Sequence, residues 1–184
     1  MRTVDKRSRL SRRSFLKTSA ATAAGVGAVS GGMVVFPAGD VWAQSMKALT
    51  ADAAQILLVM ARDVYPHDRL GDSYYAKAVE TIDAGAAKDS KVATLINDGA
   101  VQLNEMAVKK YGKGYREVAN EADRVAMLKD METTPFFQKI RGGMVTGLYN
   151  QPEVWAKLGY EGPSADKGGY LHRGFNDLDW IKDA

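Results

Sequence analysis

The chain has 184 residues, of which 46% are hydrophobic and 26% are charged, and this composition is typical of one globular domain with an additional targeting segment. It contains no cysteine, which excludes disulfides, thiolate zinc sites, iron–sulfur clusters, covalently attached c-type haem and a cysteine nucleophile. The first 43 residues carry seven of the 25 Lys and Arg residues but two of the 22 Asp and Glu residues. The rest of the chain is therefore weakly acidic, and nucleic acid is not an expected partner.

Residues 1–43 have the organisation of an export signal. Arg12 and Arg13 are followed by Phe15, Leu16 and a lysine, an order that resembles the twin-arginine consensus. Residues 18–39 carry no charge and are rich in Ala and Gly, as in the weakly hydrophobic core of such a signal. We expect twin-arginine export to the periplasm with cleavage after Ala43, and a leader retained as a membrane anchor is the alternative.

Residues 44–150 show the periodicity of a small all-α bundle of about five helices, with no alternating strand pattern. Residues typical of helix ends separate the five segments. In chain order, the helices are expected to run from Thr50 to Pro66, from Ser73 to Gly85, from Asp89 or Ser90 to Gly112, from Asn120 through Met131, and from Thr134-Pro135 to Leu148.

The fifth expected helix contains two adjacent glycines, Gly142 and Gly143. Together they cost about 1 to 2 kcal/mol of helix propensity. Two explanations remain open, namely close packing of another backbone against that face or a local kink.

Residues 151–184 form an aromatic, glycine-rich arm that follows the bundle. This segment cannot be one long helix, yet it is too aromatic for a solvated tail, so we expect it to pack on the bundle, on a partner protein, or on both. Trp and Tyr are frequent anchors of protein interfaces. The candidate interface residues are Trp155, Tyr160, Tyr170, His172, Arg173, Phe175 and Trp180, with Trp155 expected to be structural and residues 168–180 expected to carry the contact.

His67 and His172 are the chain's two histidines, and neither belongs to a catalytic or cofactor motif. Asp63, His67, Asp68 and Asp72 could be drawn as a metal cluster, but Pro66 interrupts the helix that would align them. We therefore expect His67 at a helix end, and we expect no catalytic, cofactor-binding or metal-binding residue in this chain.

Several motifs resemble those of the gluconate 2-dehydrogenase subunit 3 family, the small subunits of membrane-associated flavin-dependent sugar and alcohol dehydrogenases. The resemblance covers the leader, the first helix after it and about residues 134–170. Its motifs are residues 62–68 (RDVYPHD), 134–137 (TPFF), 147–152 (GLYNQP) with Trp155, and 158–163 (LGYEGP).

The resemblance implies a non-catalytic helical subunit without a cofactor of its own. Such a subunit escorts a large FAD-dependent dehydrogenase of the glucose–methanol–choline type through export and supports its maturation. A multihaem cytochrome c subunit is a further implied partner, and membrane association is implied only through the complex. From the residues alone, an exported helical binding protein with a ligand pocket between its helices is the alternative.

Overall fold

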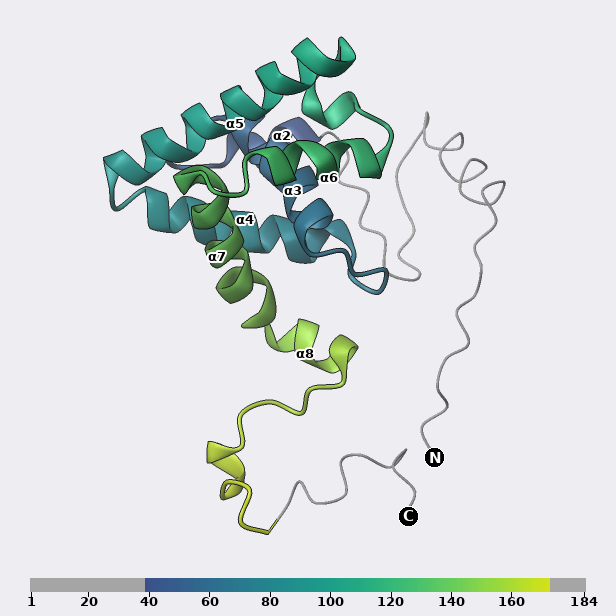
Figure 1. Ribbon diagram of the computed structural model, residues 1–184. Coiled ribbons are helices and arrows are strands. Elements are labelled where there is room, and N and C mark those ends of the chain that lie inside the picture. Colours follow the sequence, from purple (N-terminus) through teal and green to yellow (C-terminus); the bar gives the residue numbers. More distant parts are fainter. Residues whose placement is uncertain (1–38, 173–184) are drawn as a thin grey trace, which may run out of the picture. The chain divides into compact units, whose positions relative to one another are not determined.

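The computed structural model describes residues 39–172, with side chains from Trp42 onward, and this part of the chain is helical without a strand (Figure 1). The predicted all-α class is therefore confirmed. The α-helices are α2 (Gly39–Gln44), α3 (Ala51–Val64), α4 (Asp72–Ala86), α5 (Ser90–Tyr111), α6 (Glu121–Asp130), α7 (Pro135–Tyr149) and α8 (Pro152–Leu158), and the 3₁₀ turns are η1 (Tyr115–Glu117) and η2 (Ala165–Lys167).

Helices α3 to α7 are the five that the sequence predicts, and their ends follow from side-chain capping. Thr50, Asn120 and Thr134 each accept a hydrogen bond from a backbone N–H of the first helical turn, which satisfies a donor that has no partner inside the helix. Helix α5 ends at Gly112, whose φ of 69° is the left-handed conformation that glycine adopts without strain. The short helices α2 and α8 were not expected.

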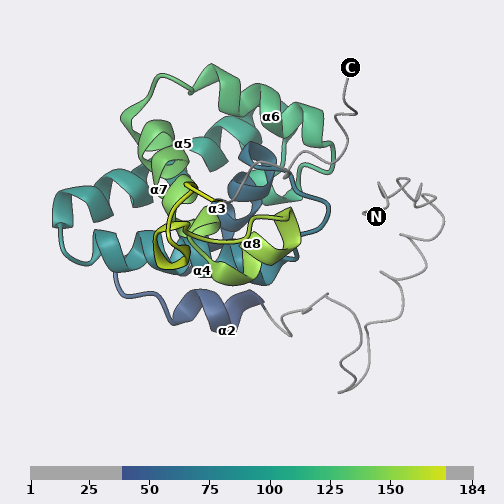
Figure 2. The same ribbon diagram turned by 90° about the horizontal axis from the view of Figure 1, so that it is seen from below.

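Helix α3 is the central element of the bundle, since α2, α4, α5, α6 and α7 all contact it (Figures 1 and 2). Its Leu57, Met60 and Ala61 have no exposed surface. Met127 and Met144 from α6 and α7 are equally buried. Burial of such side chains stabilises the fold by about 1.5 to 3 kcal/mol each.

Helices α4 and α7 approach closely because small residues line their contact. A Cβ atom at Gly147 would lie 3.1 Å from the Ala78 Cα, and one at Gly143 would lie 2.9 Å from a side-chain carbon of Ile82. Gly142 faces open space, and α7 is continuous through both adjacent glycines. Close backbone packing therefore occurs at Gly147, one turn after the glycine pair where it was expected.

A buried ion pair joins three elements of the bundle. Asp63 of α3 receives hydrogen bonds from Arg124 of α6, at 2.7 and 2.8 Å, and from the Tyr115 hydroxyl of η1 at 2.7 Å. Arg124 also donates to the Val118 carbonyl at 2.7 Å. Burial and the Asp63 carboxylate raise the pKa of Tyr115, so its hydroxyl stays protonated and donates. The charged pair is thus fully hydrogen-bonded, which a buried charge requires.

The segment that enters α3 is fixed by two polar side chains of other helices. The Asp83 carboxylate accepts hydrogen bonds from the backbone N–H groups of Lys47, Ala48 and Leu49, each at 2.9 Å. Asn97 accepts from the next N–H, that of residue 50, and donates to the carbonyl of residue 48. Burial raises the pKa of Asp83, but the three N–H groups and the Lys47 charge outweigh it and hold that pKa below the ordinary value.

Ala43, the residue after which leader cleavage is expected, lies inside α2 and is 1% exposed. The boundary drawn between leader and bundle therefore falls within a packed helix.

None of the helices in residues 39–172 combines the length and the apolar character that a membrane span requires.

Candidate functional site

The two segments that carry the family resemblance meet where α3 and α7 end. The His67 Nε2 lies 2.7 Å from the Tyr149 hydroxyl oxygen, a hydrogen bond between residues 82 positions apart. The rings of Tyr65 and His67 both meet the Tyr149 ring edge-on, with centroids 5.8 and 5.7 Å away. The Tyr65 hydroxyl donates to the Arg141 carbonyl at 3.2 Å. His67 lies just after a helix end, as expected, and fixes the end of α7.

Tyr75 of α4 binds the backbone of the same turn through its hydroxyl group. Its buried hydroxyl donates to the Tyr65 carbonyl at 2.6 Å and accepts from the His67 backbone N–H at 3.2 Å. The Arg62 guanidinium lies 5.0 Å from the Tyr75 ring centroid and pairs with Asp72 at 2.7 Å. Burial raises the pKa of Tyr75. The turn between α3 and α4 is therefore held by polar as well as aromatic contacts.

Trp155 of α8 extends the cluster outward. Its indole N–H donates to the Tyr149 carbonyl, and its ring meets the Tyr160 ring edge-on with centroids 5.5 Å apart. Gly162, at φ 92°, lies directly against the same indole. Trp155 is half-buried. We call these six residues the aromatic corner: Tyr65, His67, Tyr75, Tyr149, Trp155 and Tyr160.

Helix α8 is attached to α4 as well as to α7. The buried Gln151 donates to the carbonyls of Tyr74 and Gly147 at 2.9 and 2.7 Å, and Lys77 pairs with Glu153 at 3.4 Å. A backbone hydrogen bond and, after it, the Lys77 salt bridge lower the pKa of Glu153. Because Glu153 is exposed, the ion pair contributes little stability. The start of the C-terminal arm is thus an ordered part of the bundle rather than irregular chain.

At the end of α8 and in the chain that follows it, large apolar side chains face solvent. Four of them follow one another along this part of the chain, and we call them the C-terminal apolar surface: Leu158, Tyr160, Tyr170 and Leu171, which are 42%, 49%, 58% and 75% exposed. Exposed aromatic side chains are enriched in surfaces that bind another protein. His172 is exposed next to them.

The structure places some of the predicted interface residues and not others. Trp155 and Tyr160 lie in the aromatic corner, while Tyr170 and His172 are exposed. Arg173, Phe175 and Trp180 lie outside the described residues, as do the export residues Arg12, Arg13, Phe15 and Leu16.

The four residues that could be drawn as a metal cluster have separate partners or positions. Asp63 pairs with Arg124 in the interior, Asp72 pairs with Arg62, and His67 binds Tyr149. Asp68 is exposed. Among residues 39–172, no group of three or more His, Asp or Glu side chains is arranged to hold a metal ion.

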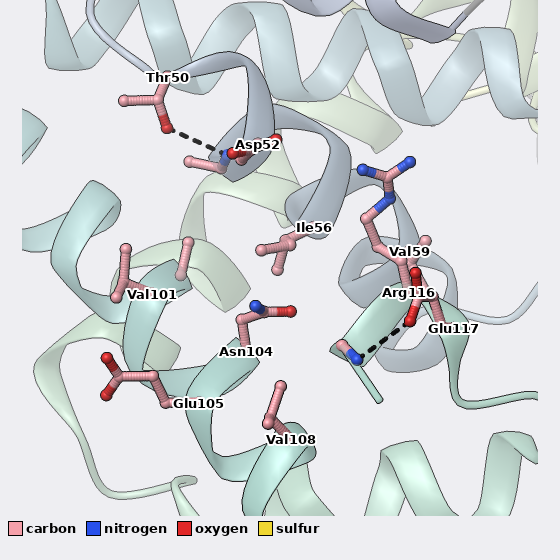
Figure 3. Close-up of a pocket in the computed structure, with 13 residues that line it drawn as sticks. Thr50, Asp52, Ile56, Val59, Val101, Asn104, Glu105, Val108, Arg116 and Glu117 are labelled. Atoms are coloured by element: carbon pink, nitrogen blue, oxygen red, sulfur yellow. Dashed lines mark hydrogen bonds between the residues drawn. The ribbon is translucent and has the colours of Figure 1, made fainter. Parts of the chain in front are cut away.

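A groove of about 910 Å³ lies between α3, α5 and η1 (Figure 3). Its apolar wall contains Ile56 and Val59 from α3 and Val101 and Val108 from α5, of which the two α5 valines are 55% and 49% exposed. Polar side chains complete its lining, namely Asp52, Asn104, Glu105, Arg116 and Glu117. Sequence reasoning did not find this groove.

Residues 9–34 match the family described as the TAT (twin-arginine translocation) pathway signal sequence. The predicted twin-arginine signal is therefore confirmed, with Arg12, Arg13, Phe15 and Leu16 inside the matched segment. No curated protein and no solved structure matches the chain. The chain is thus one that the twin-arginine pathway exports across the cytoplasmic membrane.

Proposed function

We propose that this chain is the small, non-catalytic subunit of a periplasmic flavin-dependent dehydrogenase complex, and that it escorts a large FAD-containing subunit through twin-arginine export. The observation that carries the proposal is the aromatic corner. Residues 62–68 and 147–163 carry the resemblance to the gluconate 2-dehydrogenase subunit 3 family, and they form one connected unit through the His67–Tyr149 hydrogen bond and the Trp155 indole.

The exposed side chains beside this unit suit the proposed role. Tyr170 and Leu171 present apolar area that the bundle itself does not cover. Interfaces are enriched in aromatic residues, and a few such anchors contribute most of the binding energy. The large subunit, with its FAD, and a multihaem cytochrome c subunit are the proposed partners, and membrane association is proposed through the complex.

The experiment that tests this proposal captures the chain from its own cells with an affinity tag in mild detergent. We expect a co-purified large subunit with one FAD per complex and dye-linked sugar or alcohol dehydrogenase activity. Replacing Tyr170 and Leu171 with serine is expected to weaken capture by at least tenfold, while Val101→Ser, an equally exposed apolar residue on α5, leaves it unchanged. Capture without flavin or activity contradicts the proposal.

Export supplies an independent test of the escort role. Lysine at both Arg12 and Arg13 keeps the charge but removes the paired guanidinium groups. Both this chain and its large subunit are then expected to stay in the cytoplasm. A large subunit that still reaches the periplasm contradicts the escort role.

The groove between α3 and α5 favours a second candidate function, an exported binding protein for a small apolar or aromatic ligand. Its volume of about 910 Å³ is in the range of ligand sites. A compound that binds there raises the melting temperature of the isolated chain, and Val101→Ser with Val108→Ser abolishes that rise. If no compound does so while the flavoprotein is captured, the second candidate fails.

A further inference from the structure

Helix α2 occupies the position at which the leader is expected to be removed. Val41 and Ala43 are the small residues that a signal peptidase requires at the third and first positions before the cut. A protease binds its substrate as an extended strand in its active-site cleft. In the structure the same residues form a helix, Gly39–Gln44, that ends against the bundle.

The contacts of α2 hold this junction in place. Ala43 is 1% exposed and belongs to the hydrophobic core. The Trp42 indole N–H donates to the Glu80 carboxylate of α4 at 2.8 Å, and the Ser45 hydroxyl donates to the Trp42 carbonyl at 2.7 Å. The bond between Ala43 and Gln44 thus lies within α2, and α2 contacts α3. Figure 2 shows α2 at the edge of the bundle.

The chain on the far side of the junction has little freedom to open. Asp83 holds the backbone N–H groups of residues 47–49, and Asn97 binds both the carbonyl of residue 48 and the N–H of residue 50. Ser45 and Met46 alone separate this fixed segment from α2. Extension of the junction into a protease therefore requires α2 to leave the bundle.

The export route makes this packing relevant. The twin-arginine pathway carries proteins across the membrane after they have folded, so the junction reaches the signal peptidase already packed. Cleavage of a folded protein proceeds through a transiently opened segment. Its rate is proportional to the population of the open form, so a segment that seldom opens is cut slowly.

We propose that the docked helix α2 protects the Ala43–Gln44 bond, so that the folded chain keeps its leader and is held by it at the membrane. The 22 uncharged residues at 18–39 supply the apolar segment for that contact. This inference concerns the leader junction and does not depend on the identity of the chain's partner.

The test compares the full-length chain with variants that open the junction without changing its sequence. Glu80→Ala removes the acceptor of the Trp42 indole, and Asp83→Asn weakens the bonds to residues 47–49. Thr81→Ala, an exposed neighbour on the same helix, is the matched control. Each chain is produced in cells with an intact twin-arginine pathway, and its N-terminus is determined by mass spectrometry.

We expect the wild-type chain and the Thr81→Ala control to retain residues 1–43 and to stay with the membrane fraction. The Glu80→Ala, Asp83→Asn double variant is expected to begin at Gln44 in at least tenfold higher proportion. Circular dichroism reports whether that variant is folded. If it is not, Trp42→Ala is the replacement variant, because it removes the contact of α2 with Glu80. Trp42 is the second residue before the cut, a position at which the peptidase does not select the side chain.

A purified signal peptidase provides the second measurement. A synthetic peptide of residues 33–50 has the same junction without the bundle, and we expect it to be cut after residue 43 at least tenfold faster than the folded full-length chain. Equal rates for peptide and folded chain overturn the proposal. A wild-type chain recovered from cells without its leader, cut at Gln44 or upstream of α2, also overturns it.

Discussion

The interior of the bundle contains buried charged side chains, whereas its C-terminal apolar surface contains exposed apolar side chains. Inside, Asp63 and Asp83 are buried charges, and each receives three hydrogen bonds from the groups around it. At the C-terminal surface, Tyr170 and Leu171 are apolar side chains that the described part of the chain leaves in solvent. The buried charges are paired within the described part of the chain, whereas the C-terminal surface has apolar area left for a further molecule.

The largest expected effect concerns the interior ion pair. Asp63→Asn leaves the Arg124 guanidinium without its counter-charge in a site where the arginine side chain is 16% exposed. We expect a loss of about 3 to 5 kcal/mol in the free energy of unfolding, measured by urea denaturation. Asp130→Asn, in the exposed pair with Lys110, is the control and is expected to cost less than about 0.5 kcal/mol. Equal effects would remove the contrast between inside and outside.

Trp155 lies between the interior and the C-terminal apolar surface, and variants at this position show whether it stabilises the bundle or contacts the partner. Trp155→Ala removes a half-buried ring that contacts Tyr160 and Gly162, and we expect a loss of about 2 to 3 kcal/mol in stability. Trp155→Phe keeps an aromatic ring of smaller size but removes the N–H that donates to the Tyr149 carbonyl, and is expected to cost about 1 kcal/mol. If thermal melting is unchanged in both variants while partner capture is lost, Trp155 belongs to the interface instead.

The contribution of Asp83 to the stability of the interior depends on pH. Because the folded state holds its pKa below the ordinary value, this carboxylate contributes stability that is present above the ordinary carboxyl pKa and is lost as pH falls through the lowered value. Asp83→Asn is expected to cost about 1 to 2 kcal/mol at neutral pH and to reduce the loss of stability on acidification. Urea denaturation at pH 7 and in the acid range measures this, and identical pH profiles for variant and wild type would show that Asp83 does not contribute.

The smallest expected effect on stability is at the C-terminal apolar surface. Serine at both Tyr170 and Leu171 should change the melting temperature of the isolated chain very little, since exposed side chains contribute within about 0.5 kcal/mol each. The same change is expected to weaken capture of the large subunit by at least tenfold. A lowered melting temperature would place these residues against the bundle and weaken the comparison.

The sequence predicts the bundle well where its elements are marked by caps and breakers. Thr50, Asn120, Thr134 and Gly112 delimit helices because their side chains or backbone conformations act locally. Helix α2 was missed because its residues have the composition of a cleavage junction. Helix α8 was missed because Pro152 and the glycines after it suggest loops, although Pro152 is the first residue of the helix.

The candidate site is predicted only in part. Composition alone names Tyr160 and Tyr170 as candidate contact residues of the arm, and the structure places Tyr160 against Trp155 and leaves Tyr170 exposed. The His67–Tyr149 contact joins residues 82 positions apart, and local patterns do not determine which helix ends meet. The α3–α5 groove was missed for a related reason, because its lining comes from α3, α5 and η1, which local patterns do not bring together.

The contact between Gly147 and Ala78 determines the direction in which the C-terminal segment leaves the bundle. It lies one turn before Gln151. The Gln151 side-chain N–H groups donate hydrogen bonds to the carbonyls of Tyr74 and Gly147. The Gln151 Oε1 is a buried acceptor without a partner among the described residues. A methyl group at Gly147 would lie 3.1 Å from the Ala78 Cα, so α7 would have to move away from α4 and the hydrogen bond from Gln151 to the Tyr74 carbonyl would lengthen. A substitution at this contact would therefore change the orientation of the C-terminal surface relative to the bundle. The orientation of a bound partner would change with it, although no residue of the surface itself was replaced.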